Sequence, residues 1–390
     1  ISNPMDRTAD IISYAAGHKA LGLYAMWALR NEVVRQSHPD LLPEVVQQMR
    51  LEDLLGFRKN PITKTPLFLK YGVKPLDGHP TPETPFVWLS TGPSGVGVAT
   101  STGLAMTLKD MQGDSAPAVH IIEGEGGMTP GRVAEALASA ATSGLDNLYF
   151  HVDWNQAAID SDFVTRDGDT PGDYVQWDPC EFLLVHGFNV IYVPDGFDFA
   201  QVNEAQKQAL ALNNGKPTGI VYRTVKGWKY GIEGKKSHGG GHKFYSDEYL
   251  HALKPFEEEF GVRFPRFEGE NTPENIEQAF YDSLMMIRQV FEDHDDLTRH
   301  LGDCVANSKQ RLSDSPRPLR SEAPDLGQLY APGAISPFER PEICTYETGS
   351  SQTLRGSLAH GLNHVNKLTN GAILAAAADL YGSTNISSIG

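Results

Sequence analysis

A carboxylate and an amide side chain are spaced in this sequence so that they could share one divalent cation. Glu125 lies in the turn Gly124-Glu125-Gly126, directly after an apolar run, and Asn155 follows the next apolar run. Carboxylate and amide oxygens are hard donors that suit Mg²⁺ or Ca²⁺, which keep further positions for water and phosphate oxygens. Glycines let the backbone approach a diphosphate closely. The segment therefore predicts a metal and diphosphate site, although an ordinary strand–helix–strand crossover has the same elements.

Two buried strands and a helix must position these side chains. Apolar runs at 118–123 and 148–152 predict strands whose carboxyl ends share one edge of a parallel sheet, where α/β folds bind ligands. Between them, Thr129-Pro130 predicts a helix start, because threonine accepts from free amides and proline at the first helical position loses no hydrogen bond. Gly144 predicts the left-handed end of that helix. We therefore expect Asn155 to lie beside Glu125.

Strands and helices alternate over residues 1–250, which predicts a doubly wound, mainly parallel α/β sheet with flanking helices. Further strands are expected at 86–89, 190–193 and 219–225. A helix at 273–291 should pack on this first domain, and the proline-rich, polar stretch 313–343 predicts an interdomain linker. A helix at 353–366 and a buried strand from Gly371 to Asp379 predict the start of a second α/β domain. The expected domains are thus 1–260, a helical extension and linker at 261–345, and an incomplete domain at 346–390.

Composition argues against several classes of protein. The chain has 390 residues, 40% of them hydrophobic and 21% charged, which suits two or three globular domains. No apolar run could span a bilayer and no signal-peptide pattern is present, so we expect no membrane partner and a cytoplasmic location. A net charge of −16 argues against nucleic acid as a partner. Cys180, Cys304 and Cys344 lack metal or redox spacing, which favours a reducing compartment.

Four further motifs surround the Gly-Glu-Gly turn. They are Gly17-His18, Asp77-Gly78-His79-Pro80, the loop Ser90-Thr91-Gly92-Pro93-Ser94-Gly95-Val96-Gly97, and Lys236-Ser237-His238-Gly239. In this order, together with Gly-Glu-Gly and its following asparagine, they resemble the thiamine diphosphate site of the transketolase family. A short helix over 50–59 is expected before the second motif, as in that family. Five ordered motifs are far more specific than any one of them.

The resemblance implies a role for each motif. His18, His79 and His238 would be catalytic, since an imidazole transfers protons near neutral pH. Mg²⁺ (or Ca²⁺) would be held by Glu125, Asn155 and the backbone carbonyl of Ala157. Arg355 and Ser383 would bind the phosphate of a sugar-phosphate substrate. The residues that would contact thiamine diphosphate are Gly92, Ser94, Gly124, Glu125, Gly126, Asn155, Ile159, His238 and Asp379.

The chain departs from the family pattern at three places. Glu125 stands where the family usually has aspartate, and its carboxylate reaches one methylene further. Pro130 replaces a commonly acidic residue that contributes to dimer and cofactor contacts. The Asn-Gly-His run that carries a third channel histidine has no counterpart, because His38 lies in a sequence typical of a helix-cap turn. Near the last motif, Trp228, Tyr230 and the lysines at 226, 229, 235 and 236 predict either a basic lip facing phosphates or a solvated strand end.

The resemblance implies transfer of a two-carbon ketol unit from a ketose phosphate to an aldose. A homodimer, or a second subunit that supplies the pyrimidine-binding domain, would complete the site. No residue here fits the family's catalytic glutamate, because the sequence stops at Gly390, one strand into that domain. We expect either a longer polypeptide, which we favour, or a split enzyme.

Three other functions stay open. The first is a two-oxo-acid (pyruvate) decarboxylating dehydrogenase component of the homodimeric type. Arg355 and Ser383 weigh against it, because pyruvate has no phosphate to bind. The second is a specialised two-carbon transferase that acts on a carrier-bound acceptor, and the third is a non-catalytic cofactor-binding subunit.

Overall fold

A computed structural model of the chain describes residues 6, 8–59, 65–157, 177–234, 241–336, 338–377 and 380–389. The chain forms two compact units, Ile1–Thr107 with Pro117–Pro316, and Leu108–Ala116 with Arg317–Gly390. None of the helices in the described ranges is long and apolar enough to cross a membrane. The predicted domain boundaries near 260 and 345 stay predictions.

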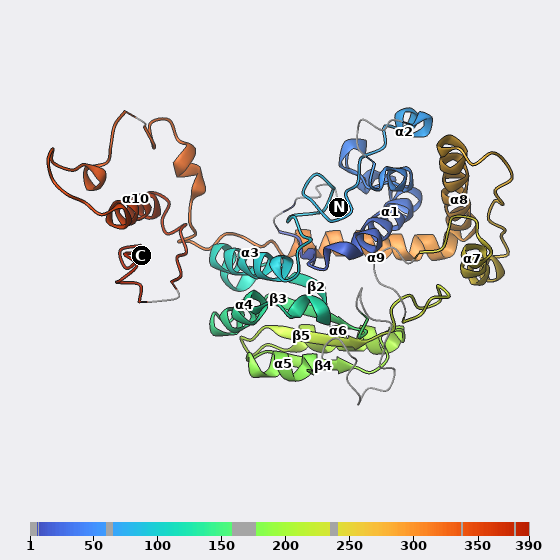
Figure 1. Cartoon of the computed structure of the whole chain (residues 1–390), viewed down its shortest axis with the longest axis horizontal. Coiled ribbons are helices and arrows are strands. Elements are labelled where there is room, and N and C mark those ends of the chain that lie inside the picture. The colour runs from blue at the N-terminus through green and yellow to red at the C-terminus, as the bar shows by residue number, and fades with distance from the viewer. Residues whose placement is uncertain are drawn as a thin grey trace. The chain divides into compact units, whose positions relative to one another are not determined.

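Five parallel strands form the sheet of the first unit, in the order β1-β2-β3-β5-β4 (Figure 1). Every neighbouring pair in this sheet is parallel, so the predicted doubly wound α/β fold is confirmed. Because the strands run in one direction, all their carboxyl ends lie at the same edge. Their bounds are β1 (Ile11–Tyr14), β2 (Val119–Gly124), β3 (Leu148–Trp154), β4 (Asn189–Val193) and β5 (Thr218–Arg223).

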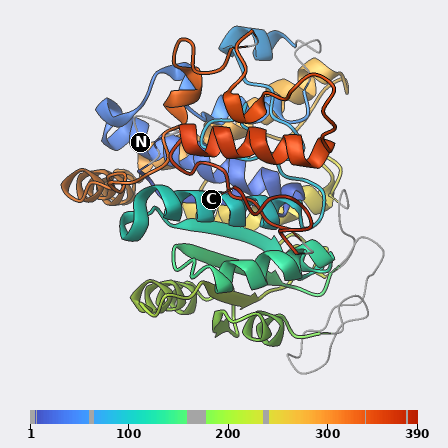
Figure 2. The ribbon, with the colours of Figure 1, turned by 90° about the vertical axis from the view of Figure 1, so that its left-hand side faces the viewer.

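Helices cover both faces of this sheet. Leu183 of α5 packs against Gly219 of β5, whereas Ala205 of α6 packs beside Ile220. Neighbouring residues of a strand point to opposite faces, so these two helices lie on opposite sides. Helices α3 and α4 run alongside the sheet, and α1 packs on α9 (Figures 1 and 2). The helices are α1 (Ala20–Ser37), α2 (Pro66–Tyr71), α3 (Val96–Gln112), α4 (Gly131–Thr142), α5 (Pro179–Val185), α6 (Phe199–Ala211), α7 (Asp247–Phe260), α8 (Pro273–Asp293), α9 (Asp295–Asp314) and α10 (Leu354–Leu368).

Two predicted strands are wrong. Residues 86–89 form a turn, in which Phe86 has a φ of 68° and stacks on Trp27 of α1 with ring centroids 4.6 Å apart. The first position in the sheet is taken instead by β1, which the sequence analysis missed. Residues 371–377 also form no strand, and most of them are exposed. A parallel strand needs a neighbour to pair with, and the described part of the second unit offers none.

The helix predicted after Gly-Glu-Gly is present, but its start is displaced. A short 3₁₀ helix, η6 (Glu125–Met128), follows β2, and α4 begins only at Gly131. The Thr129 hydroxyl donates to the carbonyl of Gly126 at 2.9 Å, so it does not cap α4 as predicted. Gly144, with a φ of 61°, ends the helix in the predicted left-handed conformation. The short helix expected over 50–59 is the 3₁₀ helix η4 (Leu51–Gly56).

A chain of hydrogen bonds between side chains crosses the middle of the sheet. His120 Nδ1 lies 2.9 Å from His151 Nε2, and His151 Nδ1 lies 2.9 Å from the hydroxyl of Tyr222. Burial, and then the neighbouring His120, lower the pKa of His151 to about 3. Burial also lowers the pKa of His120 and raises the pKa of Tyr222 to about 12. All three groups are therefore neutral at neutral pH.

We expect the variant His151→Gln to lose less stability in acid than the wild type. In the unfolded chain His151 takes up a proton near its ordinary pKa of 6.5, whereas in the folded protein its imidazole stays neutral until about pH 3. The free energy of unfolding therefore falls as the pH drops below 6.5, by about 2 kcal/mol at pH 5 from this group. Glutamine keeps a donor and an acceptor but does not titrate. Urea unfolding at pH 7.5 and pH 5 measures how much stability the wild type and the variant each lose in acid. Equal losses in the two proteins would contradict the prediction.

Candidate functional site

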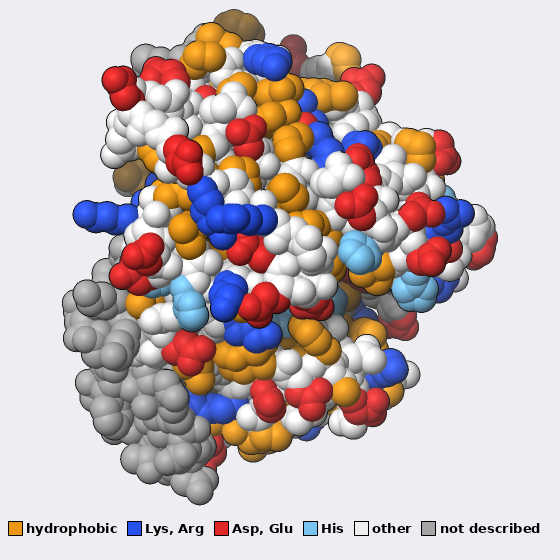
Figure 3. Space-filling model, turned by 90° about the vertical axis from the view of Figure 1, so that its right-hand side faces the viewer, with side chains coloured by type: hydrophobic (Ala, Val, Ile, Leu, Met, Phe, Trp, Pro, Cys, Tyr) orange, Lys and Arg blue, Asp and Glu red, His pale blue; other side chains and the backbone are white. Residues whose placement is uncertain are grey.

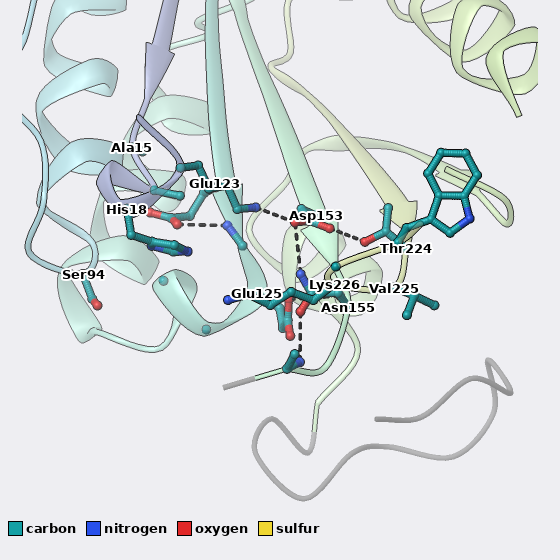
Figure 4. Close-up of a pocket in the computed structure, with 18 of the residues that line it drawn as sticks. Ala15, His18, Ser94, Glu123, Glu125, Asp153, Asn155, Thr224, Val225 and Lys226 are labelled. Carbon is teal, nitrogen blue, oxygen red and sulfur yellow. Dashed lines mark hydrogen bonds and ion pairs between the residues drawn. The ribbon is translucent and has the colours of Figure 1, made fainter. Parts of the chain in front are cut away.

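The carboxyl ends of the five strands surround one cavity of about 790 Å³ (Figure 4). Residues that follow every strand line this cavity, and two loops that carry His79 and Gly92 complete it. This is the edge at which parallel α/β sheets bind ligands. The residues that line it after each strand are Ala15, Ala16, His18 and Lys19 after β1, Glu125–Gly127 after β2, Asn155 and Ala157 after β3, Phe197 after β4, and Thr224–Trp228 after β5.

Close backbone packing joins three of the sequence motifs. A Cβ atom on Gly17 would lie 2.7 Å from the Cα of Gly92 and 2.9 Å from Cδ2 of His79. Gly92 itself has a φ of +153°, which side chains rarely allow. The Thr91 hydroxyl donates to the carbonyl of Tyr14 at 2.8 Å and ties this loop to the end of β1. The Gly-His, Gly-His-Pro and Thr-Gly-Pro motifs therefore meet at one wall of the cavity.

Glu125 and Asn155 lie together at the acidic end of the cavity. The backbone N–H of Asn155 donates to Glu125 Oε2 at 3.3 Å, and the side-chain Oδ1 of Asn155 accepts from the N–H of Ala157 at 2.9 Å. Burial, and then the negative charge of Asp153, raise the pKa of Glu125 to about 7. Carboxylate and amide oxygens are the donors that Mg²⁺ and Ca²⁺ take in proteins. The site therefore suits a divalent cation bound through oxygen donors.

Asp153 is the centre of the polar network beside this pair. It accepts hydrogen bonds from Lys19 Nζ at 2.5 Å, from the Asn155 side-chain amide at 3.0 Å and from the Thr224 hydroxyl, as the dashed lines in Figure 4 show. Burial opposes ionisation, but these three donors, Lys19 foremost, hold the pKa of Asp153 below its usual range. The bond to Asp153 fixes which end of the Asn155 amide is nitrogen, because only NH₂ can donate to a carboxylate.

A second buried carboxylate, Glu123, lies behind the glycine turn. Its Oε1 accepts from the Gly124 N–H at 2.9 Å, while its Oε2 has no hydrogen-bond partner among the described residues. Burial raises the pKa of Glu123 to about 7, against the lowering effects of that hydrogen bond and of Lys19. A Cβ atom on Gly127 would lie 2.2 Å from the Glu123 carboxyl carbon, so this position accepts only glycine without displacing the acid.

The structure brings most of the predicted site residues together. The described residues of the first unit among them all line the cavity: His18, His79, Gly92, Ser94, Gly124, Glu125, Gly126, Asn155 and Ala157. Ile159, His238 and Asp379 lie outside the described residues. Arg355 and Ser383 belong to the second unit, where the Arg355 guanidinium donates to the Ser383 carbonyl at 3.0 Å. The predicted roles of these residues stay predictions.

Several lining residues were missed by the sequence analysis. Lys19, Glu123, Asp153, Phe197 and Thr224 line the cavity without having been singled out. The signal for Asp153 was available, because residues two apart on a strand share a face and Asp153 precedes Asn155 by two. Lys226 and Trp228, which were weighed as part of a basic lip, also line the cavity. Trp228 stacks on Phe197 with ring centroids 4.2 Å apart.

Comparison with known proteins supplies the family. The family model "Transketolase, thiamine diphosphate binding domain" matches residues 45–263, more than half of the chain. "Transketolase-like protein 2" of Homo sapiens is 31% identical over 229 residues, covering 58% of this chain and 30% of that protein. "Transketolase" of Physarum polycephalum is 28% identical over 225 residues, covering 55% of this chain and 29% of that protein. The chain thus spans about a third or less of these curated relatives.

Solved structures show the same fold. The transketolase from Campylobacter jejuni superposes with a TM-score of 0.61 at 22% identity, covering 99% of this chain and 51% of that chain. The transketolase from Leishmania mexicana gives 0.60 at 19% identity, covering 99% and 50%. Together with the cavity and its ordered motifs, the match over residues 45–263 establishes that this chain belongs to the transketolase family and contains its thiamine diphosphate-binding domain.

Proposed function

We propose that the protein containing this chain is a transferase that uses thiamine diphosphate and Mg²⁺ to move a two-carbon ketol unit from a ketose phosphate to an aldose acceptor. One observation carries the proposal. Four motifs that are far apart in the sequence, centred on His18, His79, Gly92 and Glu125, line a single cavity at the carboxyl edge of the sheet. The family match supports the cofactor, and the catalytic activity is our inference.

The donor set at the acidic end of the cavity fits Mg²⁺. Glu125 and Asn155 would ligate the ion through side-chain oxygens, and Ala157 through its backbone carbonyl. Within the described ranges, no three His, Cys, Asp or Glu side chains form a metal cluster, so a cation here would depend on amide, carbonyl and phosphate oxygens. This is the ligand mixture that Mg²⁺ accepts and that Zn²⁺ does not favour.

The residues of this chain would bind and orient the reactants. Thiamine diphosphate, when bound, supplies the electron sink for breaking and forming carbon–carbon bonds. Gly92 and Ser94 would lie against its aminopyrimidine, with Ile159, His238 and Asp379 as further contacts. His18 and His79 line the cavity and would hold or move protons of the sugar hydroxyls, together with His238.

The partners follow from the same proposal. Arg355 and Ser383, which contact each other, would bind the sugar phosphate. A homodimer or a second subunit would supply the rest of the site, and the expected location is cytoplasmic. The prediction that nucleic acid is not a partner rests on the net charge of −16. On the part of the face in Figure 3 that the structure describes, acidic, basic and apolar side chains are interspersed.

A binding and a turnover experiment together test the proposal. Calorimetric titration of the purified protein with thiamine diphosphate should give Mg²⁺-dependent binding. The full polypeptide should then transfer a ketol unit between a ketose phosphate and an aldose. Decarboxylation of pyruvate without ketol transfer would favour a two-oxo-acid enzyme, and binding without any turnover would favour a non-catalytic subunit. Absence of binding would refute the proposal at its first step.

We expect Asp153→Ala to weaken Mg²⁺ binding about tenfold, through loss of the hydrogen bond that orients Asn155. The alanine variant frees the Asn155 amide to turn, and it also releases Lys19. Titration of Mg²⁺ at saturating thiamine diphosphate measures the effect. Thr224→Val, which removes another partner of Asp153 but keeps the bond to Asn155, should have a smaller effect. Equal effects of the two variants would contradict the orienting role.

A further inference from the structure

The loop that carries His79 is anchored on both sides of the histidine. Before it, the N–H of Leu76 donates to the carbonyl of Gly56 at 3.0 Å. After it, the carbonyl of Pro80 accepts from the N–H of Thr91 at 3.1 Å. The three residues between these anchors belong to no helix or strand. They must therefore take their position from other contacts.

Tyr24 of α1 supplies such a contact through its hydroxyl. The Tyr24 hydroxyl donates to the carbonyl of Asp77 at 3.0 Å and lies 3.4 Å from the carbonyl of His79. No other residue in the described part of the chain hydrogen-bonds to the backbone of residues 77–79. One side chain therefore fixes the turn from which the His79 ring projects.

Tyr24 is itself held in place by the core. Its side chain is fully buried among residues of α1, and its ring meets that of Phe57 edge-on with centroids 6.4 Å apart. Burial raises the pKa of Tyr24 to about 12, so the hydroxyl keeps its proton and remains a donor at neutral pH. Tyr24 lies on the second turn of α1, which begins at Ala20, two residues after His18. The same helix therefore positions His18 and the turn that carries His79.

The ring of His79 is oriented by two glycines. A Cβ atom on Gly17 would lie 2.9 Å from its Cδ2, and a Cβ atom on Gly92 would lie 3.3 Å from Cδ2 and 3.4 Å from Cγ. The carbon side of the ring thus packs against the two glycines, which leaves its nitrogens for other partners. Because His79 lines the cavity, a shift of its backbone would displace these nitrogens relative to a bound ligand.

We propose that Tyr24 is a positioning residue for ketol transfer, which holds the His79 imidazole where it meets the hydroxyl groups of the substrate. The inference rests on the proposed function and adds to it a residue that does not line the cavity. Proton transfer requires the donor and the acceptor to lie within hydrogen-bonding distance. A displaced His79 therefore slows the chemical step more than it weakens cofactor binding.

Tyr24→Phe tests the proposal, because it removes the hydroxyl and keeps the ring in the core. In the full polypeptide we expect kcat for ketol transfer to fall about tenfold or more, with thiamine diphosphate affinity within about twofold of the wild type. His79→Gln should also lower kcat, and the double variant should be no slower than His79→Gln alone, because both changes act on one group. Tyr245→Phe is the matched control. It removes a hydroxyl that donates to the carbonyl of Ala279 at 3.1 Å, away from the cavity lining, and should keep the wild-type kcat.

Hydrogen exchange measured by mass spectrometry gives a readout that does not depend on turnover. Tyr24→Phe should exchange faster in peptides covering residues 76–92, while peptides covering β3 keep the wild-type rate. A normal kcat, faster exchange throughout the first unit, or additive losses in the double variant would refute the positioning role and leave the proposed function intact. If the wild type transfers no ketol unit, the proposed function is wrong. Tyr24 then positions His79 only if exchange still rises in peptides 76–92 of Tyr24→Phe.

Discussion

The variant Glu125→Ala is expected to lose Mg²⁺-dependent binding of thiamine diphosphate, with affinity lowered at least about 100-fold. Loss of a residue that only orients a ligand already costs about 10- to 100-fold, and a direct ligand should cost more. Glu125 is buried at the carboxyl end of β2, and the N–H of Asn155 holds its carboxylate in place. Calorimetry with the cofactor, repeated over a range of Mg²⁺ concentrations, measures the loss.

Three companion variants separate metal binding from folding. Glu125→Asp shortens the side chain but keeps the carboxylate, so it should retain Mg²⁺-dependent binding. Glu125→Gln keeps the shape without the charge and should bind as poorly as alanine. Burial raises the pKa of Glu125 to about 7, so above this pH the ionised carboxylate destabilises the folded, metal-free protein. Removing the acid should therefore not lower the melting temperature of the metal-free protein above that pH. Glu135→Gln, on the exposed side of α4, should leave binding unchanged. Normal cofactor affinity in Glu125→Gln would show that Glu125 is not a ligand of the metal.

Most of the sheet could be predicted because four of its strands contain apolar runs bounded by turn residues. Strands β2, β3, β4 and β5 are found within two residues of their predicted bounds. The edge strand β1 was missed, since it has only four residues and includes a serine, and its identity depends on pairing with β2. The run at 86–89 is equally apolar, but Val87 is buried against residues of α1 and the half-buried Phe86 stacks on Trp27 of the same helix. An apolar run indicates that a segment is buried, but burial alone does not distinguish a strand from a packed turn.

The site was predictable where it follows directly from chain order. Glu125 and Asn155 each lie just past a strand, and parallel pairing of β2 with β3 brings them together. The ion pair between Lys19 and Asp153 joins residues 134 positions apart, and its existence depends on how β1, β2 and β3 are ordered in the sheet. Sequence motifs therefore predicted which glycines and which expected metal donors meet in the cavity. The charged side chains around them, Lys19 and Asp153, could be placed only from the structure.

Gly17→Ala is expected to destabilise the protein and to disturb the cofactor site together. The added methyl group would lie 2.7 Å from the Cα and 2.8 Å from the N of Gly92, which are backbone atoms that cannot rotate away. It would also press on the ring of His79 at 2.9 Å. Overpacking of this kind costs about 1–3 kcal/mol, and relief requires the Thr-Gly-Pro loop to move away from β1. Thermal unfolding and cofactor titration should both show the loss, because the same contact joins three motifs of the cavity wall.

The matched control is Gly22→Ala, five residues further along the chain. Gly22 lies in α1, and no atom lies within 4 Å of the position that its Cβ would take. Alanine is more favourable than glycine inside a helix by about 0.5–1 kcal/mol, so this variant should melt at a slightly higher temperature and bind the cofactor normally. Both substitutions add one methyl group, but Gly17→Ala is expected to lower the stability of the protein and Gly22→Ala to raise it. If Gly17→Ala behaved like Gly22→Ala, the close approach of Gly17 to Gly92 and His79 would not exist in solution, and the three motifs would not share one wall.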